Sequence, residues 1–369
     1  MNEDKASRYN RLKRNASVLS MVVGAGGIGA LLATGASAAI RDAAERLAPH
    51  VLQSTATVIV YVAIVLAIIE LASLPLAFYG GFILERRYEL SNESIGAWLL
   101  DQTKSLAIGF VLSGTAASIL YALIRRSPQG WWLPAGAVFA VLIVGLAQVA
   151  PVLLLPLFYT VKPLDRDALR ARLVALAERA GARVLGAYEW GLGEKTKKAN
   201  AALAGIGGTR RILVSDTMLA QYSDEEIEVV LAHEIAHHVH GDIWKGILFE
   251  SSLILAGFYL ASRTLAALAP VFGLRGVDDV AGLPLLVLTA GAVSLAAVPV
   301  AHALSRAFER RADRFALDLT RNPQAFISAM RRLGAQNLAE EHPSKIVQWL
   351  FYSHPPMLER IAAARAFES

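Results

Sequence analysis

The sequence predicts a mainly α-helical, polytopic membrane protein of about six spans that also carries a soluble α+β unit. Hydrophobic residues make up 55% of the 369 residues and charged residues only 18%, which is more apolar than a soluble protein tolerates. Several windows of about 20 residues are apolar and nearly free of charge, the length that a helix needs to cross a bilayer. Between the fourth and fifth windows the pattern becomes charged and mixed, so we expect folded structure outside the membrane there.

The apolar windows divide the chain into four parts. Residues 1–158 are expected to form an N-terminal membrane domain with four spans, and residues 246–305 a two-span membrane hairpin. Residues 159–245 and 306–369 are then the two soluble parts. The windows lie near residues 16–40, 55–84, 105–124, 132–158, 246–270 and 280–305. A cleaved signal peptide is the alternative for the first window, because its end, "ATGASAA", resembles a signal-peptidase site.

The basic residues predict which parts face the cytoplasm. Five of them come before the first window, and short basic segments stay on the cytoplasmic side of a membrane. Counting spans from there puts residues 85–104, 159–245 and 306–369 in the cytoplasm, whereas Arg125 and Arg126 are an exception on the outer side. We therefore expect a multi-pass integral membrane protein, in the inner or plasma membrane if the host is bacterial. The five residues are Lys5, Arg8, Arg11, Lys13 and Arg14.

Composition excludes several kinds of site. The chain has no cysteine, so a disulfide framework, a cysteine-ligated metal and a cysteine nucleophile are all excluded. Any metal must be bound by His, Asp or Glu. The net charge of +5 comes from basic residues spread along the chain without interleaved aromatics, which argues against nucleic-acid binding. Basic loops beside anionic lipid explain the charge more simply, so the lipid bilayer is the expected partner.

The first soluble part has the pattern of a small α+β unit. Residues 165–182 have helical periodicity. Three short strand-like stretches follow, separated by Gly-rich turns: "RVLGAYEW", "ANAALAGI" and "RRILVSD". Ser223 with Glu226 three residues later is a capping-box signature, which opens a helix of sequence "DEEIEVVLAHEIAHHVH".

Histidines on that helix indicate a metal site. His233 and His237 are four residues apart, so their rings project from one face on adjacent turns and can bind one ion. Glu234 lies about 100° round the helix, where its carboxylate can take a proton from water beside the metal. This is the H-E-x-x-H arrangement of zinc proteases. His240 is about 10 Å along the helix from His233, too far to share the ion, and His238 points elsewhere.

The second soluble part contains a candidate third ligand. In "SRAFERRADRFALDL", Glu309 and Asp313 are four residues apart and share one helix face. Glu309 can bind the metal, and Asp313 can accept the second ring N–H of a liganding histidine. Two spans separate the motifs, and this even number returns Glu309 to the side of the membrane on which the histidines lie. The alternative is a surface helix in which these acids pair with neighbouring arginines.

The combination of "HEIAH", "SRAFERRAD" and "YSHPPMLERI" resembles the type I CAAX prenyl endopeptidases, which are integral-membrane zinc metalloproteases related to the HtpX heat-shock proteases. The stretches "ERRYELSNESIGAWLLDQTKS", "PLFYTVKPL" and "NAALAGIGGTRRILVSDTML" are similar to that family's N-terminal region, pre-catalytic loop and active-site hairpin. The resemblance runs from about residue 70 to residue 363. It implies that the two soluble parts form a cytoplasmic α+β zincin-type metalloprotease domain.

The resemblance implies one Zn²⁺ per chain. His233, His237 and Glu309 would bind it, Glu234 would be the general base, and Asp313 would orient a histidine ligand. The implied activity is that of a membrane-embedded zinc-dependent endopeptidase. Its substrates would be membrane-associated or prenylated CAAX-type peptides or proteins, cleaved at the cytoplasmic face.

The resemblance also implies residues around the substrate. His354 would lie near the reacting carbonyl and Arg360 would support substrate binding, although His354 could simply cap a turn before two prolines. Asn200 and Ala201 would lie on an edge strand where an extended peptide pairs, and a purely structural hairpin is the alternative.

Other functions and departures from the family stay open at this stage. An HtpX-like protease for membrane-protein quality control shares the motifs, and a transporter or a non-catalytic membrane scaffold would also explain the spans. The eukaryotic family members have seven spans around a chamber, whereas six are counted here, and Tyr159 stands where Asn is common. The sequence predicts no oligomeric state.

Overall fold

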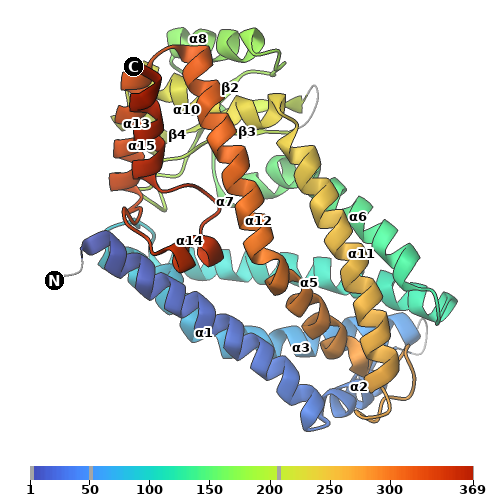
Figure 1. Cartoon of the computed structure of the whole chain (residues 1–369). Helices are drawn as coiled ribbons and strands as arrows, with labels where there is room; N and C mark the ends of the chain where they lie inside the picture. Colours follow the sequence, from blue (N-terminus) through green and yellow to red (C-terminus); the bar gives the residue numbers. More distant parts are fainter. Residues whose placement is uncertain (1–3, 50–52, 206–208, 369) are drawn as a thin grey trace.

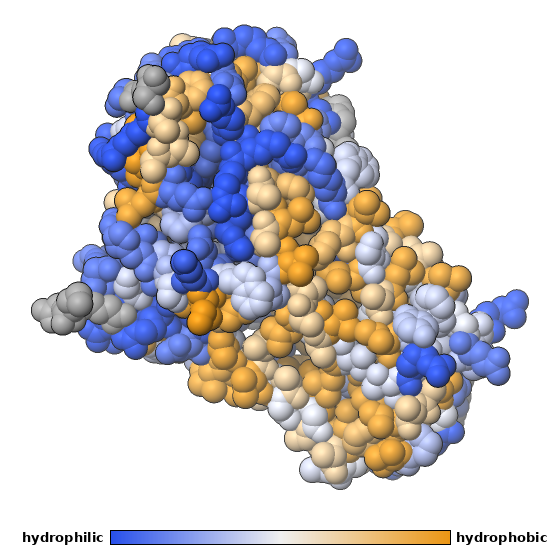
Figure 2. Space-filling view, viewed as in Figure 1, coloured by the Kyte–Doolittle hydropathy of each residue, from blue (hydrophilic) through white to orange (hydrophobic). Residues whose placement is uncertain are grey.

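The computed structural model describes residues 4–49, 53–205 and 209–368. A bundle of long helices carries a smaller unit of short helices and strands at one end (Figure 1). The surface view of the same face is apolar over the lower helices and polar over the upper unit (Figure 2). The surface therefore divides as expected for a protein with one part in lipid and one in water.

Long apolar helices form the membrane part, and short elements extend two of them. Within the described residues, five helices are long and apolar enough to span a membrane, while α6 has a shorter apolar stretch, Trp132–Ala147. The fold-class prediction of a mainly helical, multi-pass protein is confirmed. The five are α1 (Lys5–Ala33), α3 (Gln53–Phe78) with its extension, α5 (Ile95–Arg126), α11 (Asp242–Leu268) and α12 (Leu283–Thr320). The shorter helices α2 (Ala36–Leu47) and α6 (Trp132–Val149) complete the bundle. The extensions are a π-helical turn (Tyr79–Ile83) and α4 (Leu84–Arg87) after α3, and a second π-helical turn (Ala150–Leu154) and α7 (Leu155–Phe158) after α6.

The first span has different boundaries from those predicted. We predicted a window near residues 16–40, but α1 already begins at Lys5 and ends at Ala33. The chain turns at Gly35, whose φ of 73° is left-handed and costs glycine little. The basic residues at the N-terminus therefore lie inside α1, and only residues 36–40 of the window belong to α2.

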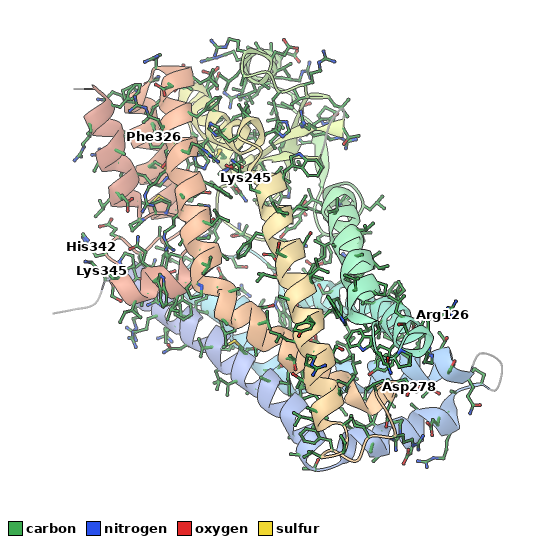
Figure 3. The ribbon with its side chains drawn as sticks, turned by 45° about the vertical axis from the view of Figure 1, so that its right-hand side comes forward. Arg126, Lys245, Asp278, Phe326, His342 and Lys345 are labelled. Carbon is green, nitrogen blue, oxygen red and sulfur yellow. The ribbon has the colours of Figure 1, made fainter. Side chains whose placement is uncertain are left out.

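Buried charge ties the spans together at the end remote from the strands. Arg41 of α2 pairs with Asp279 in the loop between α11 and α12, and both side chains are buried. Tyr121 of α5 donates a hydrogen bond to the carbonyl of Asp279 at 3.2 Å. Apolar residues of these and neighbouring helices surround the cluster. Figure 3 shows Arg126 and Asp278 at this same end of the bundle.

The unit at the other end contains a four-stranded sheet of order β1-β2-β4-β3. β2 and β4 are parallel, and the other two pairings are antiparallel, so β3 lies at an edge. Three of these strands fall on the three stretches predicted from the sequence. The fourth, β1, was not predicted because it is only three residues long and ends in proline. The strands are β1 (Val161–Pro163), β2 (Ala187–Trp190), β3 (Ala201–Ala204) and β4 (Arg211–Ser215).

Helix α10 lies at the centre of this unit and contacts α8, β3, α12 and α13. A single apolar core joins residues from both predicted soluble parts, among them Leu173, Ile212, Leu231 and Phe326. Burial of this core fixes α10 and α12 against each other. The helices are α8 (Asp167–Arg179), α9 (Asp216–Gln221), α10 (Asp224–Val239), α13 (Pro323–Gln336), α14 (Lys345–Phe351) and α15 (Met357–Glu368).

Candidate metal centre

Helix α10, which carries the two histidines, is fixed at both ends. The hydroxyl of Ser223 accepts from the N–H of Glu226 at 3.2 Å, and the Glu226 carboxylate accepts from the N–H of Ser223 at 2.8 Å. This is the capping box that the sequence predicts. Gly241, with a φ of 65°, ends the helix and lets α11 begin at Asp242. Between these two ends, the buried face of α10 packs in the core and fixes the direction of each of its side chains.

Three side chains converge from α10 and α12. The Nε2 atoms of His233 and His237 lie 3.3 Å apart. The Glu309 carboxylate lies 3.2 Å from Nε2 of His233 and 3.3 Å from Nε2 of His237. The structure thus brings together the three residues that the sequence proposes as ligands of one ion.

The spacing of these donor atoms fits a tetrahedral metal site. An ion about 2.0–2.1 Å from each donor requires donors about 3.3 Å apart when its coordination is tetrahedral. The two ring nitrogens are separated by this distance, and each lies at a similar distance from a different oxygen of the Glu309 carboxylate. One buried oxygen of Glu309 has no hydrogen-bond partner among the described residues, and a bound cation would satisfy it. The residues present therefore fit a divalent metal ion.

A carboxylate contacts the other ring nitrogen of each histidine. Nδ1 of His233 lies 2.8 Å from Asp313, its predicted partner, and Nδ1 of His237 lies 3.1 Å from Asp242. Both carboxylates are buried. A proton donated from Nδ1 leaves the lone pair of Nε2 free for a metal.

The negative charge of these carboxylates also favours the binding of a cation at this site. Burial lowers the pKa of His233, but the neighbouring carboxylates of Asp313 and Glu309 outweigh this effect and raise the pKa to about 9. A group of side chains that holds a proton this firmly has an excess of negative charge, which favours a divalent cation in the same place.

Asp242 is a residue that the sequence analysis missed. It lies five residues after His237 and beyond the end of α10, so helical spacing does not bring the two together. The glycine before it is the signal that could have found it, because a left-handed residue turns the chain back toward the last turn of the helix. Arg311 and Lys245 both pair with Asp242 and hold its carboxylate beside His237.

Arg360 of α15 holds Asp313 in place. Its Nε donates to one oxygen of Asp313 at 2.9 Å and its Nη2 donates to the other, which is the strong bidentate form of this pair. Nη2 also lies 3.3 Å from Nδ1 of His233. The resemblance assigns Arg360 to substrate binding. In the structure its guanidinium contacts Asp313 and His233, and it also lines a cavity beside the three converging residues.

Glu234 lines a cavity of about 290 Å³ beside the three converging residues. Apolar side chains of α13, of the loop before α15 and of the start of α15 form much of its wall, among them Met330, Pro355 and Met357. Burial raises the pKa of Glu234 above its usual value, and the neighbouring His233 partly offsets this effect. A higher pKa makes the carboxylate a better proton acceptor.

His354 reaches the site from the loop between α14 and α15. Its Nε2 lies 3.4 Å from Glu309, and its side chain is 59% exposed. Arg306 holds the end of α14 and the start of this loop by donating through Nη1 to the carbonyls of Gln348 at 3.1 Å and Tyr352 at 2.7 Å. Because Arg306 precedes Glu309 by one helical turn, α12 positions both the carboxylate and the loop. The sequence analysis did not single out Arg306, since it is one of several arginines in that motif.

The predicted substrate strand borders the same cavity, which both Asn200 and Ala201 line. The N–H of Asn200 donates to the Ser215 hydroxyl at 3.0 Å, and its carbonyl accepts from the N–H of Ser215 at 2.9 Å. Both backbone groups of Asn200 therefore face β4. Since backbone groups alternate along a strand, those of Ala201 face the free edge.

The two remaining histidines of α10 lie outside the cluster. The group of potential metal ligands in the described residues contains neither His238 nor His240. The ring of His240 packs against Phe315 with 5.4 Å between centroids. This outcome agrees with the helical-distance argument that excluded His240.

A multi-pass helical membrane part, an edge-exposed sheet and a buried His-His-Glu cluster beside a further glutamate together define an integral-membrane metalloprotease. Comparison with known proteins identifies the family. Residues 163–368 match peptidase family M48, and residues 2–160 match the family described as CAAX prenyl protease N-terminal, five membrane helices. The chain belongs to peptidase family M48, and the resemblance found in the motifs is confirmed.

Individual relatives agree with this assignment. The uncharacterized metalloprotease YhfN of Bacillus subtilis is 32% identical over 343 residues, which cover 92% of this chain and 80% of the relative. CAAX prenyl protease 1 of Saccharomyces cerevisiae is 25% identical over 334 residues, which cover 85% of this chain and 73% of the yeast protein. The crystal structure of S. mikatae Ste24p has the same fold, with a TM-score of 0.88 at 22% identity over 98% of this chain and 88% of that chain.

Proposed function

We propose that the chain is a zinc-dependent endopeptidase that hydrolyses peptide bonds of membrane-associated substrates, prenylated CAAX-type peptides among them, at the cytoplasmic face of its membrane. The observation that carries this proposal is the convergence of His233, His237 and Glu309, whose ligand atoms lie within 4.8 Å of one another, with Glu234 and a cavity beside them. The relatives named CAAX prenyl protease 1 support the substrate class.

In the proposed reaction, His233, His237 and Glu309 hold the ion while Asp313 and Asp242 keep both imidazoles in the required tautomer. When bound, zinc supplies a Lewis acid that lowers the pKa of water and polarises a carbonyl.

The proton transfers fall to Glu234, and His354 assists the reacting carbonyl. Glu234 accepts a proton from the attacking water and returns it to the leaving amine. His354 is exposed toward the site and can donate to the carbonyl oxygen as negative charge develops there.

The free edge of β3 would hold the substrate. An extended peptide that pairs with the outward N–H and C=O of Ala201 lies along the wall of the cavity that Glu234 also lines. Pairing along the backbone orients the scissile bond without requiring particular side chains. Arg360 lines the same cavity, so it would contact the bound substrate in addition to holding Asp313.

The position of the N-terminus supports a cytoplasmic site. Lys5 pairs with Glu89 at 3.1 Å, and Arg14 pairs with Glu340 at 2.6 Å in the segment between α13 and α14. The basic start of α1 and the metal centre are therefore at the same end of the bundle. Basic segments near spans favour the cytoplasm, which supports the predicted orientation.

Quality control of membrane proteins, as in HtpX-like proteases, is the second candidate function. The same metal centre would serve it. The match of residues 2–160 to the CAAX prenyl protease N-terminal family favours the first candidate. Membership of a peptidase family removes the reason for considering a transporter or a non-catalytic scaffold.

The test compares a farnesylated CAAX peptide with an unmodified membrane-protein fragment, using purified protein with and without a zinc chelator. We expect chelator-sensitive cleavage, faster for the farnesylated peptide. We also expect Glu234→Gln to keep its zinc while kcat falls by about 10²–10⁴-fold, the usual contribution of a general base.

The control for this variant is Glu225→Gln, the same change at a more exposed position on α10, which should retain wild-type kcat. Activity near wild type in Glu234→Gln would remove the general-base assignment. Faster cleavage of the unmodified fragment would favour quality control instead.

A further inference from the structure

The segment that leads into β3 has one edge against β4 and the other toward the end of α13. The carbonyl of Lys198 accepts from the hydroxyl of Thr217 at 2.8 Å, and both backbone groups of Asn200 bond Ser215. These two residues therefore face the β4 side. By the period of two in a strand, the backbone groups of Ala199 and its alternate neighbours face outward.

Two side chains at the end of α13 bond these outward groups. Gln336 donates to the carbonyl of Lys197 at 2.7 Å. Asn337 bonds Ala199 twice: its Oδ1 accepts from the N–H at 3.1 Å, and its Nδ2 donates to the carbonyl at 3.2 Å. An amide group that bonds both the N–H and the C=O of one residue imitates the next strand of a sheet.

The outer edge is different from Ala201 onward. Among the described residues, none bonds the outer edge at Ala201 or Leu203. The change from a bonded edge to a free edge occurs in the wall of the active-site cavity, which Ala199, Ala201 and Asn337 all line. A side chain therefore closes the edge at the place where a peptide would begin to pair.

The turn that follows holds Asn337 firmly. Asn337 is the C-cap of α13, and Leu338 after it has a φ of 50°, which is uncommon for such a residue. The N–H of Ala339 donates to the carbonyl of Gly334 at 2.8 Å. Asn10 of α1 donates to the carbonyl of Leu338 at 2.7 Å. Contacts from two helices thus fix the position of the amide.

We infer that Asn337 sets the register of the substrate: it closes the edge at Ala199, so an extended peptide can pair only from Ala201 onward. This inference rests on the proposed peptidase function. A strand can shift its pairing by two residues and keep its side chains on the same faces, whereas a shift by one would turn them over. Opening the edge at Ala199 therefore offers the peptide a second register, displaced by two residues, in which a different bond is cleaved.

The experiment maps cleavage of β-casein, an unstructured polypeptide, by mass spectrometry for the wild type and Asn337→Ala. We expect the variant to give new products cleaved two residues away from wild-type bonds. The hydrogen bonds gained at Ala199 change binding by about two- to tenfold, so the displaced products should reach yields within about tenfold of the original ones. Zinc content should be that of the wild type.

Two further variants separate register from folding. Asn337→Asp keeps an acceptor for the N–H of Ala199 but loses the donor to its carbonyl, so it should give fewer displaced products than Asn337→Ala. Gln336→Ala is the matched control, because it removes a similar amide from Lys197 while Ala199 remains closed. Its cleavage map should equal that of the wild type.

An unchanged cleavage map in Asn337→Ala would overturn the inference. Loss of the fold or of zinc in both Asn337 variants would make Asn337 a structural residue and would overturn it as well. Glu234→Gln in the same assay separates this failure from that of the proposed function. An inactive Glu234→Gln with an unchanged Asn337→Ala map rejects only the inference, whereas an active Glu234→Gln rejects the proposed function.

Discussion

The carboxylates behind the two histidines govern how well the imidazoles are held for a metal. Asp313 is fixed by Arg360, and Asp242 by Arg311 and Lys245. Partners of this kind orient the ligand ring and raise its basicity, and their loss weakens metal binding without removing a ligand.

We therefore predict that Asp242→Asn binds zinc about 10–100-fold more weakly than the wild type. A chromogenic chelator competing for zinc measures the change. Asp318→Asn is the control, because that carboxylate lies on the exposed side of α12 and pairs with Arg314 and Arg321. Wild-type affinity in Asp242→Asn would mean that this carboxylate does not orient His237.

The residues that the sequence predicted and those that it missed differ in a physical way. His233, Glu234 and His237 lie within five positions on one helix, so helical spacing alone relates them. Asp242 lies across a helix break, and the role of Arg306 depends on a loop more than 40 positions later. Local periodicity carries no information on such contacts.

At the level of elements, the ends of α10 keep its histidines in register with α12. The capping box at Ser223 fixes the start of the helix, and Glu226 also accepts from the hydroxyl of Ser328 at 2.5 Å, which links α10 to α13. Loss of the N-cap of α10 would therefore lower the stability of the soluble unit without moving the metal ligands.

We predict that Ser223→Ala lowers the free energy of unfolding of the soluble unit by about 1 kcal/mol, as expected for loss of an N-cap. Thermal unfolding in detergent measures it, and zinc content should stay constant. Ser344→Ala, at the N-cap of α14, should have a smaller effect because that short helix buries no residue fully. Equal effects of the two changes would contradict a special role for the start of α10.

Sequence patterns predicted most of the helices and strands, and each prediction that was missed has an identifiable cause. Alternation and glycine turns predicted β2, β3 and β4, whereas β1 was too short to have a pattern. The boundary after Ala33 was missed because an apolar window does not reveal a left-handed glycine within it. The contact between Asn337 and Ala199 joins segments far apart in the sequence, and only the fold brings them together.

In the whole molecule, the return of α12 from the far end of the bundle makes the metal centre possible. The even number of spans between the motifs predicted this return. The sequence did not predict that α1 would contact the loops of the peptidase unit, as Asn10 and Arg14 do. Those contacts place the basic N-terminus beside the site.

The orientation can be tested by labelling, because the chain has no cysteine of its own. Asp278 and His342 are exposed and lie at opposite ends (Figure 3). We predict that a membrane-impermeant maleimide labels Asp278→Cys in intact spheroplasts of a bacterial expression host, and His342→Cys only after lysis. Labelling in the reverse order would place the metal centre outside the cytoplasm.

Zinc content, measured by mass spectrometry on protein purified without added metal, tests the central claim most directly. We predict about one zinc per chain in the wild type and in Glu359→Ala, an exposed carboxylate on α15, and less than about a tenth of that in Glu309→Ala and His237→Ala. A full complement of zinc in Glu309→Ala would contradict the proposed three-residue metal centre.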